Sequence, residues 1–213
     1  MSMRKTRVIA ALAALAALTA VAGCAKYTIA PPAINLMDYA DLGMVAFRAE
    51  GVQGELGGTA AQYFLEEITR AQRVPVVEMG APGEVLAKID RTAFDRETAK
   101  AVGAEYGVRS YFLGEVAISK VKPQVDLAAP SVKTLFVRAT FDIAMTVRFV
   151  SAENGATLWT KSTRREGTVG ALGLGSDGIP TFSIGDKNEA MSNLLRDMAY
   201  QLTWDFRPTR RRL

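Results

Sequence analysis

The longest regular pattern in the chain is an alternation of apolar and polar residues between positions 135 and 149. A period of two over fifteen residues predicts one long β-strand with a buried face and a solvent-facing face. Glu153, Asn154 and Gly155 follow as a turn, and residues 157–165 are predicted to pair back as a hairpin. The apolar odd positions are Leu135, Val137, Ala139, Phe141, Ile143, Met145, Val147 and Phe149.

The first half of the chain predicts a strand, a helix and a second strand. Residues 42–47 form an uncharged apolar run, which is typical of a buried strand, and residues 74–79 form a second strand. Between them Thr59 begins a predicted amphipathic helix. Its apolar residues are Ala61, Phe64, Leu65 and Ile68, and the residues predicted to turn outward are Glu66, Glu67 and Arg70.

The remaining elements complete an α+β fold. The pattern predicts further helices at 82–89, 95–106 and 190–202, a strand at 110–121, and a loop at 122–132 that contains two prolines. We therefore expect a mixed, partly antiparallel sheet with a long central hairpin and amphipathic helices packed on it in an α/β two-layer arrangement. The tryptophans Trp159 and Trp204 are predicted to pack in the core or against helices.

Residues 167–187 are rich in glycine and show no regular period. Such a long irregular segment in a compact domain is typically functional or mobile, and a hairpin with arms at 168–175 and 179–185 is the alternative. The segment lacks the lysine and the adjoining helix of a phosphate-binding loop, which disfavours nucleotide binding. A partner-binding or pore-lining loop is the hypothesis here, and its residues are Gly170, Leu172, Leu174, Ile179 and Phe182.

The N-terminus has the layout of a bacterial lipoprotein signal peptide. Three basic residues precede an apolar run from Val8 to Ala22, which at fifteen residues is shorter than the roughly 20 that a membrane-crossing helix needs. Its end, Val21-Ala22-Gly23-Cys24, resembles the lipoprotein box, whose cysteine becomes the lipidated first residue of the mature protein. Because Cys24 is the only cysteine, the sequence predicts that Cys24 is acylated and anchors the chain to a membrane.

Four segments follow from this interpretation. They are a signal peptide at 1–23, a lipidated tether at 24–40, a single periplasmic α/β domain at 41–206 and a basic tail at 207–213. The tail holds four arginines, whereas residues 24–206 carry 19 basic and 22 acidic residues. This slightly acidic balance argues against nucleic-acid binding, which needs a basic face on the folded body.

Catalytic chemistry has few candidate residues in this chain. It contains no histidine, and with Cys24 acylated no free thiol remains, which excludes Ser-His-Asp and Cys-His catalysis and most catalytic zinc sites. The carboxylates show neither a spacing that places two in one site nor a calcium-binding pattern, and Glu115 is predicted on the solvent face of its strand. The sequence predicts no enzymatic activity, no cofactor and no metal site.

Three stretches resemble the curli secretion lipoprotein family, which also includes the lipoprotein activators of penicillin-binding proteins and the amino-terminal domain of the TolB translocation protein. They are residues 42–47 with the glycine-rich turn and helix after them, residues 103–115, and residues 156–162 after the long strand. The resemblance implies a non-enzymatic periplasmic domain, anchored in the outer membrane of a Gram-negative bacterium. Such a domain assists assembly or regulation of a cell-envelope complex through protein contacts.

The channel-forming members of this family suggest an alternative. In those proteins each subunit contributes two membrane-crossing hairpins. Residues 122–132 are the first candidate for such a hairpin here, but they are too few for two crossing strands of about 9 residues each. This short segment argues against a channel, so a subunit of an oligomeric outer-membrane secretion channel is only the alternative hypothesis. The expected partners are the membrane through the lipid on Cys24, an unidentified envelope protein and, in the alternative, further copies of the chain. Ala25 rather than an aspartate follows Cys24, which by resemblance implies outer-membrane sorting.

Overall fold

The structure, a computed structural model, describes residues 27–39, 41–50, 56–119, 122–125, 137–169, 172–174, 180–182 and 184–212. The chain divides into two compact units. One is Ala33–Arg207, and the other combines Met1–Pro32 with Pro208–Leu213.

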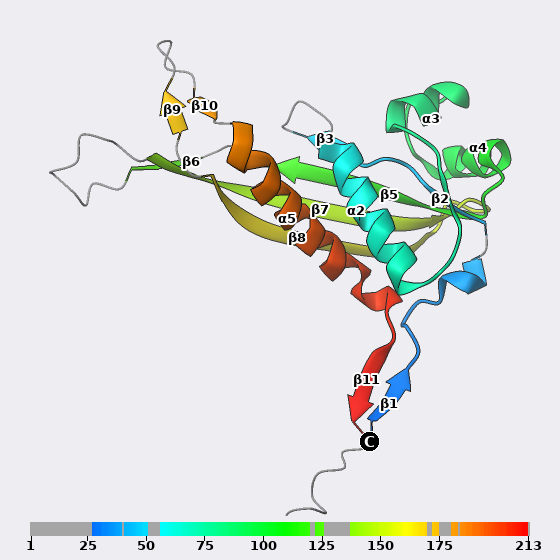
Figure 1. Cartoon of the computed structure of the whole chain (residues 1–213). Coiled ribbons are helices and arrows are strands. Elements are labelled where there is room, and N and C mark those ends of the chain that lie inside the picture. The colour runs from blue at the N-terminus through cyan, green and yellow to red at the C-terminus, as the bar shows by residue number, and fades with distance from the viewer. Residues whose placement is uncertain are drawn as a thin grey trace, which may run out of the picture. The chain divides into compact units, whose positions relative to one another are not determined.

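A seven-stranded mixed sheet forms the centre of the larger unit (Figure 1). Strand β7 (Val137–Ser151) pairs antiparallel with β5 (Ser110–Ile118) and with β8 (Thr157–Val169), as the apolar alternation predicts. Strand β6 (Lys122–Val125) also pairs with β7, so the predicted loop at 122–132 is wrong for its first four residues. Proline at position 123 misled the prediction, because a proline is tolerated in a strand that pairs along one edge.

The other half of the sheet is parallel. Strand β2 (Leu42–Met44) lies between β4 (Val76–Glu78) and β5 and runs parallel to both. Strand β3 (Arg48–Glu50), which the sequence pattern did not predict, also pairs with β5 in parallel. Strand β5 therefore joins the parallel half of the sheet to the antiparallel half.

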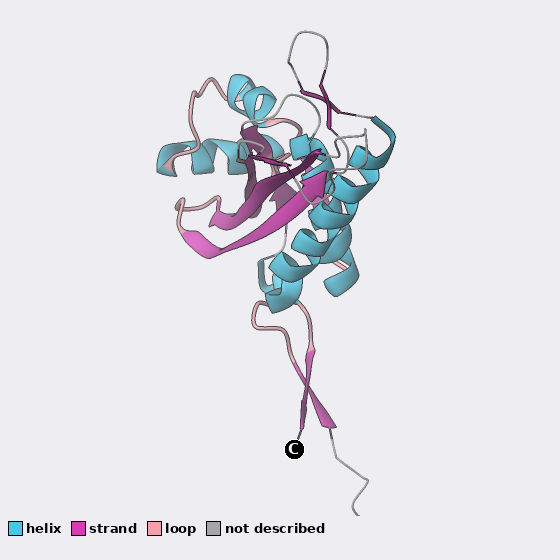
Figure 2. Cartoon of the chain, turned by 90° about the vertical axis from the view of Figure 1, so that its left-hand side faces the viewer, coloured by secondary structure: helices cyan, strands magenta, loops and turns pink. Residues whose placement is uncertain are grey.

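Helices cover both faces of the sheet (Figure 2). Helices α2 (Leu56–Ala71) and α5 (Ile184–Leu202) pack on one face, together with the 3-10 helix η2 (Thr203–Phe206). Helices α3 (Pro82–Lys88) and α4 (Arg96–Tyr106) cover a smaller cluster on the opposite face. The predicted α+β class is confirmed, with this second helix pair as an addition to the expected layers.

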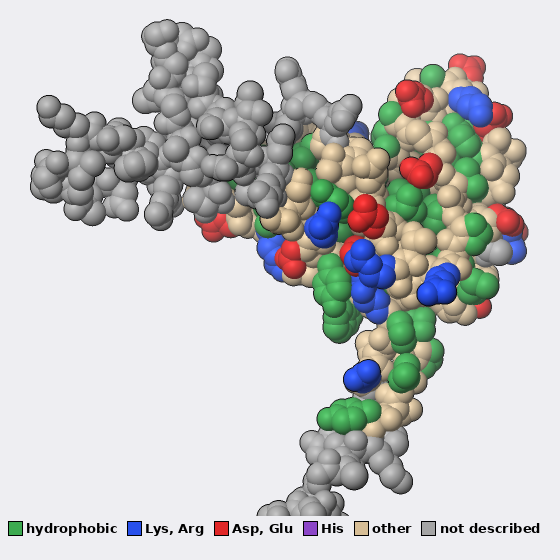
Figure 3. Space-filling model, viewed as in Figure 1, with side chains coloured by type: hydrophobic (Ala, Val, Ile, Leu, Met, Phe, Trp, Pro, Cys, Tyr) green, Lys and Arg blue, Asp and Glu red, His purple; other side chains and the backbone are tan. Residues whose placement is uncertain are grey.

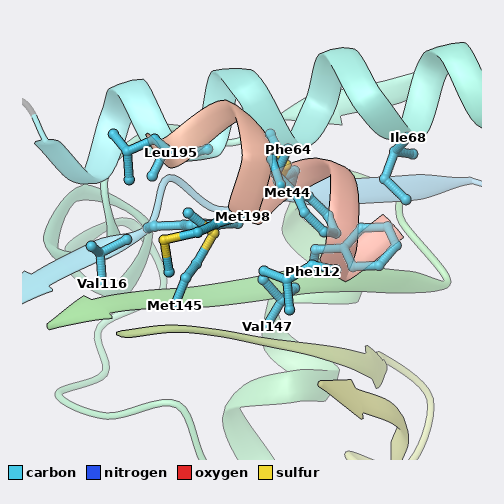
Figure 4. Packing of buried hydrophobic residues seen from close by; sticks show 14 of the residues in the cluster. Met44, Phe64, Ile68, Phe112, Val116, Met145, Val147, Leu195 and Met198 are labelled. Atoms are coloured by element: carbon cyan, nitrogen blue, oxygen red, sulfur yellow. The ribbon is translucent and has the colours of Figure 1, made fainter. Parts of the chain in front are cut away.

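Aromatic rings hold the larger hydrophobic cluster together (Figure 4). Phe112 on β5 lies directly opposite Phe149 on β7, and their rings stack with centroids 4.6 Å apart. Phe64 of α2 and Phe206 of η2 meet the ring of Phe112 edge-on, at 5.3 and 5.9 Å. Edge-to-face and stacked pairs of this kind add stability beyond the burial of their area. The helices and the sheet are therefore joined at one aromatic centre.

Helix α4 shows how local sequence signals set an element's ends. The Asp95 carboxylate accepts a hydrogen bond from the backbone N–H of Thr98 at 2.8 Å, which caps the helix and lowers the pKa of Asp95. Gly107 then ends the helix with a positive φ of 66°, a conformation that favours glycine. Both ends were predicted from the sequence, and both are confirmed.

The smaller unit contains an antiparallel ribbon of two strands. Strand β1 (Tyr27–Ala30) comes from the predicted tether, and β11 (Thr209–Arg212) comes from the predicted basic tail. The predicted tether also overlaps the larger unit, because the 3-10 helix η1 (Leu36–Tyr39) places the side chain of Leu36 in its core. Short strands that pair across almost the whole chain leave little local signal in the sequence.

Truncation of the central aromatic pair tests this account of the fold. Phe149→Ala should lower the free energy of unfolding by about 3–5 kcal/mol, because it removes a fully buried ring that contacts Phe112. Leu158→Ala on the neighbouring strand truncates an exposed side chain and should cost less than about 1 kcal/mol. Urea unfolding of both variants measures the difference, and equal costs would contradict the central role of the pair.

Candidate functional site

A row of large side chains runs along one side of α5 and η2. Arg196, Tyr200 and Trp204 follow one another at intervals of four residues, which places them on one face of a helix. The Arg196 guanidinium lies 4.8 Å from the centre of the Tyr63 ring on α2. Together with Arg207, these five residues form what we call the α2/α5 patch.

Two of the three aromatic side chains of the α2/α5 patch are exposed to solvent, and Tyr63 is half-buried. Tyr200 is 42% exposed and Trp204 is 48% exposed, and their rings meet edge-on at 6.2 Å. The Arg207 guanidinium lies 4.3 Å above the Tyr200 ring, within range of a cation–π interaction. Figure 3 shows basic side chains beside hydrophobic and acidic ones on the face where α2 and α5 lie. The patch therefore presents aromatic rings that are held in place by arginines.

A buried carboxylate lies beneath the patch. Glu67 of α2 is 2% exposed, and its two oxygens accept hydrogen bonds from the guanidinium groups of Arg207 and Arg70. Arg207 also donates to the Thr203 hydroxyl at 3.3 Å. The prediction that Glu67 turns outward is wrong. Its position three residues after the buried Phe64 could have revealed this, since that spacing keeps both side chains on one face.

The two tryptophans have different environments. Trp159 of β8 packs against the core, as predicted, with its ring 4.8 Å from that of Phe206. Its Nε1 donates to the Asp205 carboxylate at 3.1 Å, and Lys161 donates to the same oxygen at 3.0 Å. Trp204 faces solvent instead of the core and contacts Tyr200 of α5, so of its two predicted environments the core is wrong and the helix contact is observed. The turn from α5 into η2 directs Trp204 outward and Phe206 inward.

The side chain of Gln72, just after α2, ties the two ends of the larger unit together. Its Nε2 donates to the carbonyl oxygens of Ile34 and Phe206 at 2.7 and 2.9 Å, and its Oε1 accepts from the N–H of Leu36 at 2.7 Å. Backbone groups that are removed from water need such partners. The segment where the chain leaves the larger unit is therefore fixed, and Arg207 of the patch lies in this segment.

Two hollows on the larger unit are lined by residues that the structure describes. One of about 600 Å³ lies between η1, α4 and the β7–β8 turn, and another of 390 Å³ includes Glu115, Arg48 and Arg148. Glu115 is exposed, as predicted. Tyr111, on the same strand as Glu115, is buried, and this burial raises the pKa of Tyr111 to about 12. No group of three or more His, Cys, Asp or Glu in the described ranges could hold a metal ion.

Half of the six site residues predicted from the sequence lie outside the described residues. These three are Cys24, Gly170 and Ile179. Residues 172, 174 and 182 lie in strands β9 (Leu172–Leu174) and β10 (Pro180–Phe182), which pair antiparallel with each other. Acylation at Cys24 and the partner or pore role of this loop stay predictions. Within the described part of the chain, no helix combines the length and apolar character of a membrane span.

Comparison with known proteins gives distant structural likenesses and no sequence match. No protein-family model matches the chain, and no curated protein matches its sequence. Membership of the curli secretion lipoprotein family therefore stays a prediction.

Three solved structures illustrate the structural likeness. The PelC dodecamer from Paraburkholderia phytofirmans is 14% identical, with a TM-score of 0.46 over 87% of this chain and 98% of that one. Lipoprotein GNA1162 from Neisseria meningitidis is 12% identical, with a TM-score of 0.40 over 75% and 98%. The LpoB C-terminal domain from Salmonella enterica is 9% identical, with a TM-score of 0.36 over 60% and 83%. Likenesses of this degree say nothing about activity or partners.

The ion pairs of the buried Glu67 carboxylate give a direct test of how the patch is built. Glu67→Gln should lower the free energy of unfolding by about 1.5–3 kcal/mol, because it leaves the mostly buried Arg207 without its carboxylate partner. Glu66→Gln on the exposed side of the same helix removes the same charge and should stay within about 0.5 kcal/mol. Urea unfolding at pH 7 measures both. A Glu67→Gln variant as stable as Glu66→Gln would show that the network does not hold the patch.

Proposed function

We propose that the chain is a lipid-anchored lipoprotein of the outer membrane of a Gram-negative bacterium. In this proposal its body faces the periplasm and works without catalysis, binding a protein of a cell-envelope complex and assisting that complex's assembly or regulation. The α2/α5 patch is the observation that carries the binding role. The lipoprotein box at Cys24 supports the location.

The composition of the α2/α5 patch favours a protein partner. Tryptophan, tyrosine and arginine are the residues most enriched among the few that dominate binding energy at protein interfaces. Here Trp204 and Tyr200 are exposed, while Arg207 is held by Glu67 and Tyr200. Side chains that are already ordered lose less conformational entropy on binding, so a preformed patch binds more tightly than a mobile one.

Acylation of Cys24 is the first test of the proposal. Cells grown with labelled palmitate should incorporate it into the wild-type chain and not into a Cys24→Ala variant, because that cysteine is the only thiol available for a thioether-linked lipid. Two or more acyl chains make anchoring stable where a single chain does not. Ala25→Ser, one residue further on, should keep the label. Equal labelling of wild type and Cys24→Ala would contradict the anchor.

The partner role is tested by placing a photo-crosslinking residue at Trp204 in living cells. We expect it to capture an envelope protein that is absent when the same residue replaces Val77, which is 46% exposed on β4. With the purified partner, Trp204→Ala should raise Kd about 30-fold, since it removes a hot-spot side chain worth about 2 kcal/mol, while Val77→Ala should change Kd less than threefold. Identical captures from both positions would contradict the proposal.

The same crosslinking separates the proposal from its alternative. In an oligomeric secretion channel the crosslinker at Trp204, or one in the loop at 167–187, would capture a second copy of this chain. Detergent-extracted protein would then run as a ring of several copies and conduct ions in a lipid bilayer. A monomer without conductance would rule the channel out.

A further inference from the structure

We propose that the β1–β11 ribbon is a second membrane contact, which binds the headgroups of anionic phospholipids beside the lipid anchor. This inference rests on the proposed acylation of Cys24. It is independent of the α2/α5 patch and of any protein partner. The site is one face of the ribbon together with the arginines of β11.

The register of the ribbon places basic and apolar residues on one face. Ile29 lies opposite Arg210, and Tyr27 lies opposite Arg212. Residues directly opposite in an antiparallel pair share a face, and so do residues two apart along a strand. Tyr27, Ile29 and Arg210 therefore share one face. They come from two strands that lie at opposite ends of the chain.

The two apolar residues on this face are exposed. Tyr27 is 63% exposed and Ile29 is 71% exposed, the highest value among the large hydrophobic residues of the described part of the chain. A two-stranded ribbon by itself is marginally stable in water, and this one has only four residue pairs. A surface that buries Tyr27 and Ile29 would stabilise it. Tyrosine is enriched where a membrane meets water, because its ring prefers apolar surroundings and its hydroxyl prefers water.

The position of Cys24 identifies that surface as a lipid bilayer. Tyr27 follows Cys24 by three residues, so the two Cα atoms are at most about 11 Å apart. The backbone of Arg212 lies one strand spacing, about 5 Å, from that of Tyr27. The headgroup layer on each side of the hydrocarbon is roughly 5–8 Å thick. If acyl chains hold Cys24 where the headgroup layer meets the hydrocarbon, β1 begins within or next to the headgroups.

The charge of the ribbon specifies the kind of lipid. Residues 25–32 and 208–212 contain four basic residues, Lys26 and the three arginines of β11, and no acidic residue. The body between them is slightly acidic, so the positive charge is concentrated in the unit that carries the anchor. A basic residue close to an anionic bilayer contributes about fivefold to binding, and this effect falls off within a Debye length of about 8 Å. Pairing with β1 places Arg212 beside Tyr27, the described residue that is nearest to Cys24 along the chain.

Vesicle binding by the mature chain, residues 24–213 without acyl groups, tests the ribbon separately from the anchor. It should bind vesicles of phosphatidylcholine with one-quarter phosphatidylglycerol at low salt, and not vesicles of phosphatidylcholine alone. Replacing Arg210, Arg211 and Arg212 by Gln should weaken binding on the order of a hundredfold. Replacing the exposed Arg73, Arg91 and Lys100 of the body by Gln removes the same charge and should weaken binding less than threefold.

A second pair of variants tests the apolar part of the face. Tyr27→Ser with Ile29→Ser should weaken the binding that remains at high salt, whereas Met37→Ser with Val77→Ser, at exposed positions of the body, should not. Equal losses from the ribbon and body variants would overturn the proposal, as would binding that does not depend on phosphatidylglycerol or an equal affinity for soluble polyphosphate. Palmitate labelling of Cys24 without anionic-vesicle binding would refute the ribbon and leave the anchor intact. Binding to anionic vesicles without palmitate labelling would refute the anchor and leave the lipid binding of the ribbon standing.

Discussion

The stacking of Phe112 on Phe149 is the contact on which the larger unit depends. It lies where β5, the last strand of the parallel half of the sheet, meets β7, the first of the antiparallel half. Trp159 of β8 is the next residue across the same face, so a row of aromatic residues crosses three strands. Phe64 and Phe206 reach this row from α2 and η2. One set of rings thus joins the sheet to α2 and η2, and a shift of one residue in β7 would turn Phe149 to the opposite face.

Polar side chains on and just after α2 extend this order to the surface. Glu67 holds Arg207, and Gln72 holds the backbone at Ile34 and Phe206. Buried polar groups of this kind are costly when one partner is missing, so they specify a unique arrangement when all are present. The α2/α5 patch is therefore held through Glu67 by the same helix that packs Phe64 into the core. A binding surface on a rigid element is more precise than one on a loop.

The sequence could predict those parts of the fold whose signal is local. The alternation along β7 and the helical segment at 95–106 each decide a structure from neighbouring residues, and both predictions are confirmed. Strand β3 and the β1–β11 ribbon could not be predicted in this way, because strands of three or four residues acquire their identity from distant partners. The α2/α5 patch lies between these cases. The spacing of four from Arg196 to Trp204 is visible in the sequence, but the carboxylate of Glu67 beneath it reverses the usual rule that glutamate faces water.

The bonds of Gln72 also determine how the larger unit responds to mechanical load. A pull that enters through the N-terminal segment reaches Ile34, whose carbonyl oxygen and N–H are bonded to Gln72 and to Asp205. Gln72 also bonds the Phe206 carbonyl through the same amide nitrogen, so this one side chain links the two ends of the unit. The first non-covalent bonds to meet such a pull are therefore the hydrogen bonds of Ile34 to Gln72 and to Asp205, which can break and re-form.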